Sequence, residues 1–346
     1  MFAEEADRAL AKGVDWLIAQ QAKDGGWHST TYGQLKDGSG VTSLALYAIA
    51  HSPPAMRERY RDNVLRGYAF LEPGLAMKQT IASPDGSLDY PTYAGALWLA
   101  GRTRHRLDSQ TDLRRASVLK YLLDAQVAEP RGFAKESPSY GGWDFLGPDD
   151  ARGITTGTNI SVTAYVLEAL PGAGAKEVRT RAIAWTLRCQ QADGGFAFTP
   201  EPMSLSNKAG FGDEAGARPR SYGTATCDGI RALLAAGMKP NDEPVRKAVL
   251  WLARRPGVEV VPGFESLPLE AGWQRGLRYY YAASQAKCLP RFPQPEQAAR
   301  SQSLRKHLME AQSEDGSWQN DSNRMREDDP LIATSLALIA LGELSR

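Results

Sequence analysis

Two hydrophobic patterns alternate along this chain of 346 residues. In the first, apolar residues recur at helical spacing and charged residues fall on the opposite side, as with Val178, Ala182, Trp185 and Cys189 at i, i+4, i+7 and i+11. This spacing predicts a helix with one face in the core and the other in solvent. Similar stretches occupy residues 5–21, 111–126, 176–191 and 296–312.

The second pattern is apolar on nearly every side. It is found in "GVTSLALYAIA", "SVTAYVLEAL", "TATCDGIRALLAAG" and "LIATSLALIALGEL", at residues 40–50, 161–170, 224–237 and 331–344. A helix with almost no charged face must be enclosed by protein, so we expect these helices to lie inside the first kind.

Two weaker pairs complete the alternation, residues 61–71 with 83–101 and residues 243–255 with 271–289. The alternation of the two patterns therefore predicts about six outer–inner helix hairpins at irregular spacing. An open solenoid has more regular repeats and polar terminal caps, whereas six hairpins can close into a ring. We predict an all-α, single-domain α/α toroid over residues 1–346.

A recurrent turn follows several of the outer helices. It is written "QQAKDGGW" at residues 20–27, "QQADGGF" at 190–196 and "QSEDGSW" at 312–318. Glycine accepts the backbone angles that end a helix, and the aromatic ring could stack on a glutamine amide. We interpret the turn as a structural fastener between hairpins.

Composition and charge exclude several classes of partner. Forty-one basic and 40 acidic residues leave a net charge of +1. Without a basic block, the chain lacks the electrostatic signature of nucleic-acid binding. No apolar run is long enough to cross a membrane, and the acidic start does not resemble an export signal. We expect a soluble protein, cytoplasmic by default; a trimmed export signal, peripheral membrane contact and the oligomeric state stay open.

The turns carry a family resemblance. Gln-x-x-x-Asp-Gly-x-Trp turns between outer and inner helices resemble the repeats of the squalene-hopene cyclase and protein prenyltransferase β-subunit superfamily, over essentially the whole chain. The stretches "LSNKAG", "RSYGTATCDGIRALLAAGM", "GLRYYYAASQAKCL" and "DGSWQN" are more similar to short bacterial proteins with prenyltransferase and squalene oxidase repeats. The resemblance implies an isoprenoid or another hydrophobic ligand in the lumen and, for an enzyme, a class II terpene cyclase-like isomerase.

The acid cluster that the resemblance implies is missing. Class II terpene cyclases carry Asp-x-Asp-Asp-Thr-Ala at the start of an inner helix, and residues 159–164 fit its end best. Asn159, Ser161 and Val162 stand where the acids should be. None of these side chains delivers a proton at neutral pH, so catalysis would need a relocated acid.

The zinc site of the prenyltransferases is missing as well. Cys227 falls in the corresponding unit, but Ala225 stands where the aspartate should be, and Tyr279 or Tyr280 occupies the region of the histidine. Three scattered cysteines offer neither a zinc ligand spacing nor a disulfide framework. We expect neither a metal nor another cofactor.

A relocated acid is expected at the mouth of the ring where the inner helices begin. The carboxylates in such positions are Asp37, Asp89, Asp149, Asp150, Asp328 and Asp329. We predict Asp329 as the acid, followed by Asp328 and Asp37. The alternative that Asp329, before a proline, is an ordinary helix N-cap stays open.

Ligand contacts are expected from two long glycine-rich loops, residues 138–157 and 198–224, and from inner-helix aromatic residues that could stabilise positive charge. The candidates are Trp143, Asp144, Asn159, Lys208, Arg220, Tyr222, Tyr279 and Tyr280. The fold does not decide between an enzyme and a non-catalytic toroid that binds a hydrophobic ligand or a protein segment. An apolar cavity with a carboxylate at its end favours the enzyme, and a lumen filled by side chains favours the second alternative.

Overall fold

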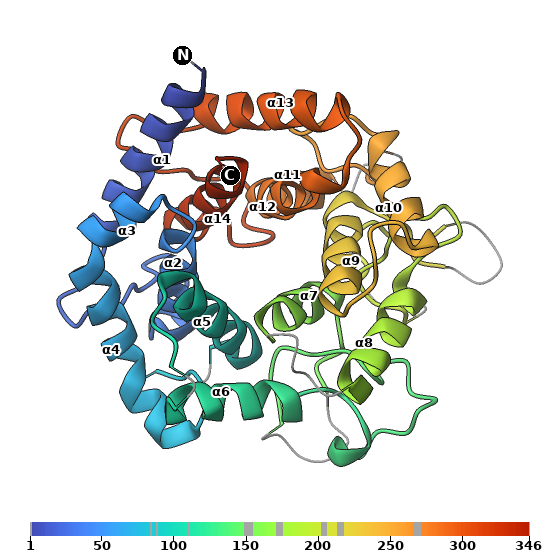
Figure 1. Cartoon of the computed structure of the whole chain (residues 1–346), viewed down its shortest axis with the longest axis horizontal. Coiled ribbons are helices and arrows are strands. Elements are labelled where there is room, and N and C mark those ends of the chain that lie inside the picture. Colours follow the sequence, from blue (N-terminus) through green and yellow to red (C-terminus); the bar gives the residue numbers. More distant parts are fainter. Residues whose placement is uncertain are drawn as a thin grey trace.

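The helices form two concentric rings (Figure 1) in a computed structural model that describes residues 2–83, 85–87, 89–109, 111–148, 155–170, 176–201, 206–212, 218–265 and 271–345. The inner ring consists of α2 (Ser39–Ile49), α5 (Pro91–His105), α7 (Ile160–Ala169), α9 (Gly223–Ala235), α12 (Arg278–Cys288) and α14 (Pro330–Leu344). The outer ring consists of α1 (Phe2–Ala19), α4 (Arg61–Lys78), α6 (Leu113–Asp124), α8 (Lys176–Cys189), α10 (Glu243–Ala253) and α13 (Glu296–Glu310).

Short elements connect these helices: α3 (Pro54–Arg59), α11 (Ala271–Gly276) and the 3₁₀ turns Gly33–Leu35, Glu129–Arg131 and Leu289–Arg291. Within the described ranges, only two isolated β-bridges occur and no strand. The prediction of an all-α toroid with alternating outer and inner helices is confirmed.

The inner ring is closed. Each inner helix packs against the next in the order α2, α5, α7, α9, α12 and α14, and α14 packs against α2. On the outside, α1 contacts both α13 and α14, so the two ends of the chain meet without a covalent link.

The burial of the side chains differs between the outer and the inner helices. In α13 only Arg300, Leu304 and Leu308 are buried, a stripe at i, i+4 and i+8 on one face. In α14 nearly every residue from Leu331 to Leu344 is buried, because this helix has protein on all sides. The two sequence patterns thus correspond to one buried face and to full enclosure.

Glutamine side chains fasten each turn to the following outer helix. Every such amide nitrogen donates to the carbonyl of a glycine in its own turn and to a backbone carbonyl in the next outer helix; these are Gln21, Gln126, Gln190 and Gln312. Gln312 donates to Gly316 at 2.8 Å and to Ala9, in α1, at 2.9 Å. The last turn therefore closes the ring.

The other turn residues also have identifiable roles. Trp27 donates its indole N–H to the carbonyl of Leu17 at 2.7 Å, and Trp318 bonds to Leu308 in the same way. Gly25 has a φ of 95°, and a Cβ there would lie 2.7 Å from the carbonyl oxygen of Arg66 in α4. Hydrogen bonds to backbone carbonyls therefore explain the fastening, and the expected stacking of a ring on an amide is not needed.

Candidate functional site

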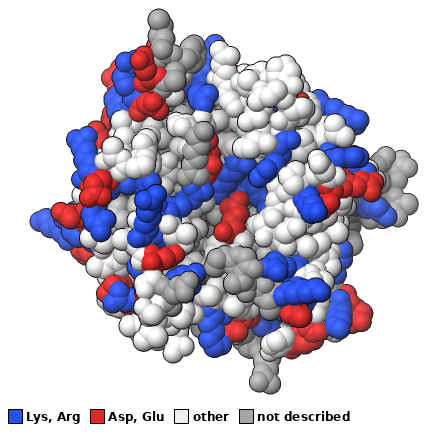
Figure 2. Space-filling view, in the orientation of Figure 1, with Lys and Arg blue, Asp and Glu red and all other residues white. Residues whose placement is uncertain are grey.

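Charged side chains from several inner helices meet across the lumen. Arg231 of α9 holds Glu168 of α7 through two hydrogen bonds of 2.8 Å and binds Asp228 Oδ1 at 2.6 Å. Lys287 of α12 donates to Glu168 at 2.9 Å and to the hydroxyl of Tyr47, on α2, at 2.8 Å. Since α2, α7 and α12 are not neighbours in the ring, this network bridges the lumen. Figure 2 shows charged side chains of both signs gathered at the centre of one face.

The same network holds Asp228 in place. Its Oδ2 accepts hydrogen bonds from the hydroxyls of Tyr280 at 2.8 Å and Ser161 at 3.0 Å, and its Oδ1 accepts one from Ser284 at 2.9 Å. Asp228 and Arg231 are both almost completely buried. Such a satisfied polar network rigidifies the part of the lumen that it fills.

The two lumen carboxylates differ in acidity. Burial raises the pKa of Asp228, although the charge of Arg231 partly opposes this shift. Burial would also raise the pKa of Glu168, but the charges of Arg231 and Lys287 outweigh it and hold that pKa well below its usual range. Glu168 is therefore a permanent anion that neutralises two cations.

A continuous series of aromatic rings leads from the start of α5 into the lumen. The Tyr90 ring centroid lies 5.5 Å from that of Phe145, which lies 5.9 Å from Tyr93. Tyr93 is 5.5 Å from Tyr165, and Tyr165 is 6.4 Å from Tyr280. These separations are typical of edge-to-face and tilted aromatic pairs.

Protein cations already cover part of this series. Arg231 and Lys287 lie 4.5 and 4.9 Å from the Tyr165 centroid, and Arg326 lies 5.2 Å from that of Tyr90. Tyr93 and Phe145 are partly exposed, and no cation of the described chain lies over either ring. Tyr280 is likewise partly exposed without a cation over its ring in the described chain, so Tyr93, Phe145 and Tyr280 are the rings of this series able to meet an external positive charge.

Asp89 stands at the beginning of this aromatic series. Its residue is 5% exposed, and its Oδ2 accepts a hydrogen bond from the backbone N–H of Gly40 at 3.1 Å. Its Oδ1 is buried without a partner in the described chain, as are the hydroxyls of Ser39 and Thr92 at the starts of α2 and α5. Three buried polar groups at two adjacent helix starts thus have no hydrogen-bond partner in the described chain.

The acidity of Asp89 also suits it to carry a proton. Burial raises its pKa to about 6, with a further increase from Asp37, against the lowering effects of the Gly40 N–H and Arg326. A carboxyl with a pKa near neutrality can donate a proton and recover it.

The three predicted acids have structural partners. Asp329 is the N-cap of α14: its Oδ1 accepts the Leu331 N–H at 2.9 Å, and its Oδ2 accepts the Ser29 hydroxyl. Asp328 accepts the Tyr32 hydroxyl at 2.5 Å, and Asp37 accepts the Ser87 hydroxyl at 2.8 Å. The N-cap alternative for Asp329 is therefore confirmed as its structural role, and catalysis by any of the three stays untested. Asp149 and Asp150 lie outside the described residues.

Trp143, Asp144 and Asn159 are buried in structural positions. Trp143 is fully buried, and its indole N–H donates to the carbonyl of Leu122 at 2.7 Å, as in the other turns. Asp144 is also fully buried and binds Arg131 at 3.2 Å. Asn159 caps α7 by accepting the Val162 N–H. These structural contacts account for the burial of the three side chains, and ligand contacts by Trp143, Asp144 and Asn159 stay a prediction.

The consecutive tyrosines of α12 point in different directions. Tyr280 faces the lumen through Asp228, whereas Tyr279 is buried and its hydroxyl donates to the Gln319 carbonyl at 3.4 Å. Glu327 holds the start of α12 by accepting the backbone N–H groups of both tyrosines. Of the two, only Tyr280 belongs to the candidate site.

The remaining loop candidates, Tyr222, Arg220 and Lys208, differ in their surroundings. Tyr222 is buried against Phe264, with ring centroids 5.3 Å apart. The backbone N–H of Arg220 bonds to Gly210 at 3.0 Å. Lys208 inserts its amine between aromatic rings, 3.3 Å from the centroid of Phe198. Lys208 is thus the loop residue that lies in an unusual chemical environment.

A metal centre finds no support in the described part of the chain, where no three His, Cys, Asp or Glu side chains are arranged to hold an ion. The three cysteines are buried and free. No described helix combines the length and the apolar character required to cross a membrane.

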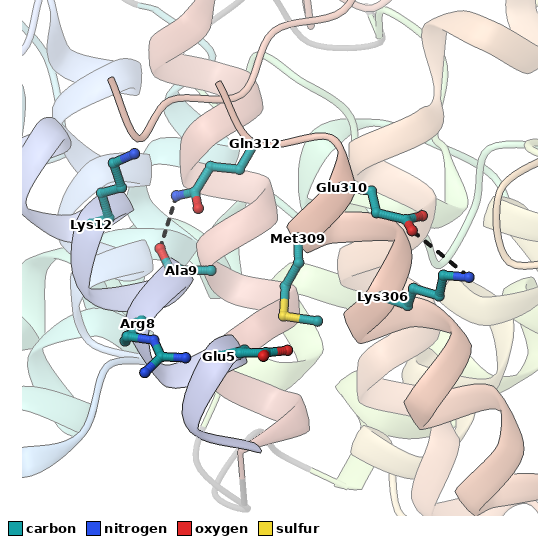
Figure 3. A pocket seen from close by; sticks show the side chains of 8 residues that line it. All are labelled: Glu5, Arg8, Ala9, Lys12, Lys306, Met309, Glu310 and Gln312. Carbon is teal, nitrogen blue, oxygen red and sulfur yellow. Dashed lines mark hydrogen bonds and ion pairs between the residues drawn. The ribbon is translucent and has the colours of Figure 1, made fainter. Parts of the chain in front are cut away.

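A groove of about 450 Å³ lies on the outside of the molecule, where α1 and α13 meet (Figure 3). Its lining mixes acids and bases, and Glu310 pairs with Lys306 at 3.7 Å. It shares no residue with the lumen network or with the Asp89 corner. We therefore place the candidate site in the lumen, from Asp89 to Tyr280.

The closed ring and its lumen define a protein with a terpene-cyclase-like α/α toroid fold. The type II terpene cyclase MstE from Scytonema has a similar structure, with a TM-score of 0.65 at 15% identity over 99% of this chain and 98% of that one. A protein from Actinoplanes has a TM-score of 0.64 at 16% identity, over 99% of this chain and 100% of that one. A glycosidase variant in complex with glucose has a TM-score of 0.56 at 13% identity, over 99% and 97%. No protein-family model and no curated protein matches the sequence.

Proposed function

We propose that this protein binds an isoprenoid in its lumen and starts an acid-catalysed cyclisation with the carboxyl group of Asp89. The observation that carries the proposal is the Asp89 corner: a buried carboxyl with a pKa raised to about 6 and one oxygen without a partner in the described chain. The likeness to a terpene cyclase supports it, because a variant of MstE was solved with geranylgeranyl dihydroxybenzoate as substrate. The resemblance to short bacterial proteins with prenyltransferase and squalene oxidase repeats points to the same ligand class.

The proposed reaction is an isomerisation in which every proton is accounted for. The protonated Asp89 gives its proton to a substrate alkene and becomes a carboxylate, while the alkene becomes a carbocation. A second double bond attacks the cation and forms a ring, and loss of a proton to a base restores a neutral product. Tyr93 and Phe145 would stabilise the cation by cation–π attraction, since their ring faces carry no protein cation in the described chain.

Asp89 is preferred to Asp329 for a geometric reason. Asp329 directly precedes the proline that begins α14, and its side chain caps that helix by accepting the Leu331 N–H. Asp89 stands one residue farther from Pro91, the start of α5, and Tyr90 takes the N-cap position. The carboxyl of Asp89 is therefore not used by the α5 amides.

The test compares Asp89→Asn with Asp329→Asn, a matched change of another buried aspartate before an inner helix. The purified proteins are incubated with squalene and with geranylgeranyl-bearing substrates, and the products are separated by gas chromatography and identified by mass spectrometry. We expect Asp89→Asn to lower turnover by about 10²-fold or more and Asp329→Asn to retain it. Full turnover in Asp89→Asn, or a loss confined to Asp329→Asn, would refute the assignment.

The alternative is a binding toroid without catalysis. One observation favours it: the network of Glu168, Arg231 and Lys287 spans the lumen and satisfies itself. Tight isoprenoid binding by the unmodified chain with no product from any substrate would establish this alternative, and product formation would exclude it.

A further inference from the structure

Lys208 has an environment that no other described lysine shares. Its amine lies 3.3 Å from the centroid of Phe198 and 5.5 Å from that of Trp273, and its residue is 9% exposed. Among the described residues, the amine has one long hydrogen bond, of 3.4 Å, to the carbonyl of Ser206. No carboxylate of the described chain lies within ion-pair distance of it.

Two charged groups of the described chain act near this cage. Asp228 of α9 acts on Lys208 through space, and Arg324 lies 5.6 Å from the Trp273 centroid. Burial lowers the pKa of Lys208 to about 7, and the charge of Asp228 only partly opposes this shift. At neutral pH, a large share of the molecules therefore carries an uncharged amine with a free electron pair.

Lys287 provides the internal comparison. Its side chain is 7% exposed, but Glu168 and Tyr47 both bind its amine, and its pKa is raised despite burial. The pKa values of the two lysines thus shift in opposite directions, because Lys287 has an anion in contact and Lys208 has none in the described chain. Cation–π attraction to Phe198 and Trp273 does not replace a counter-ion in contact.

We propose that Lys208 is a covalent binding site for an apolar aldehyde or ketone, which it captures as an imine. The nitrogen electron pair adds to the carbonyl carbon, and the carbonyl oxygen leaves as water with the two protons of the amine. The products are one imine and one water, so neither an oxidant nor a reductant is required. A neutral imine also removes the uncompensated charge from the cage, and the rings of Phe198 and Trp273 favour an apolar, conjugated substituent.

The experiment uses cinnamaldehyde as the probe and sodium cyanoborohydride to reduce the imine to a stable amine. The whole chain is treated at pH 7 under native conditions, and peptide mass spectrometry measures the initial labelling rate of each lysine. We expect Lys208 to be labelled at least about tenfold faster than the exposed lysines, because a lower pKa exposes more of the nucleophilic form. The labelling rate of Lys208 should rise with pH through a midpoint near 7.

Two controls make the result decisive. Lys287 should remain unlabelled, since labelling of both buried lysines would mean that the ring opens and would overturn a site-specific reaction. Lys208→Arg should lose the fast label and keep its circular dichroism spectrum; if that variant does not fold, the pH profile of the unmodified chain decides. Labelling of Lys208 no faster than that of exposed lysines refutes the proposal, and this outcome leaves the role of Asp89 untouched.

Discussion

Replacing Asp89 by asparagine should stabilise the protein at neutral pH. In the folded chain the pKa of this carboxyl is about 6, against an ordinary value of 3.8. At pH 7 the carboxylate is therefore ionised in a site that disfavours its charge, and this lowers the free energy of unfolding. A difference of about two pKa units corresponds to about 3 kcal/mol, at about 1.4 kcal/mol per unit. Asparagine keeps the shape and can still accept the Gly40 N–H.

The sign of the pH dependence follows from the same two values. Below about pH 4 the carboxyl is protonated in both the folded and the unfolded chain, so the variant gains nothing. Between the unfolded and folded pKa values, the unfolded chain has released its proton while the folded chain retains it, so the stability of the unmodified protein falls as pH rises. Above the folded pKa of about 6 the full penalty remains. The advantage of Asp89→Asn should therefore appear between about pH 4 and pH 6 and then stay constant.

Thermal unfolding followed by circular dichroism, from pH 4 to pH 8, measures this difference. For a chain of 346 residues, about 3 kcal/mol corresponds to a melting temperature about 4 °C higher at pH 7. Asp329→Ala is a useful contrast, because the loss of its N-cap should destabilise the protein. A stability gain of Asp89→Asn that does not change with pH, or a net loss at pH 7, would refute the interpretation of Asp89 as a strained acid.

Two further predictions concern the ring and its lumen. Gln21→Ala should lower the free energy of unfolding by about 1–3 kcal/mol, because Gln21 makes four hydrogen bonds of 2.8 Å. The matched control is Gln20→Ala, which changes an exposed neighbour and should have little effect. Equal effects of the two changes in chemical denaturation would contradict the fastening role. Arg231→Met should cost about 3–5 kcal/mol, since Glu168 and Asp228 lose their shared cation, and adding Glu168→Gln should restore part of the loss. A double variant less stable than the single one would contradict this account.

The architecture could be predicted because it follows from one repeated physical requirement. An outer helix needs one apolar face, whereas an inner helix is apolar on nearly every side. Each kind of helix therefore has its own hydrophobic pattern in the sequence. The hairpin around Gln126 shows the limit of this reasoning. An insertion separates Gln126 from the glycines of its turn, Gly141 and Gly142, so the turn is not recognisable in the sequence. In the structure Gln126 still donates hydrogen bonds to the carbonyls of Gly141 and Val178.

The lumen was less predictable because the orientation of a side chain within an enclosed helix leaves no periodic signal. Asp228, Arg231 and Glu168 occupy helices that were predicted to be apolar on nearly every side, and their charges neutralise one another only after the helices assemble. Tyr279 and Tyr280 are adjacent and equivalent in composition, yet only the second reaches Asp228.

Asp89 and Asp329 differ by one residue in their distance from a helix-starting proline, and their contacts differ accordingly. Both Asp89 and Asp329 precede an inner helix that begins with proline, and the sequence favours the aspartate next to the proline because its position is the more conspicuous. That position commits its oxygens to the Leu331 N–H and the Ser29 hydroxyl. Asp89, one residue farther away, has a single amide partner and one buried oxygen without a partner among the described residues. Burial of that carboxyl raises the pKa of Asp89, so the displacement by one residue leaves an acid that can hold a proton near neutral pH.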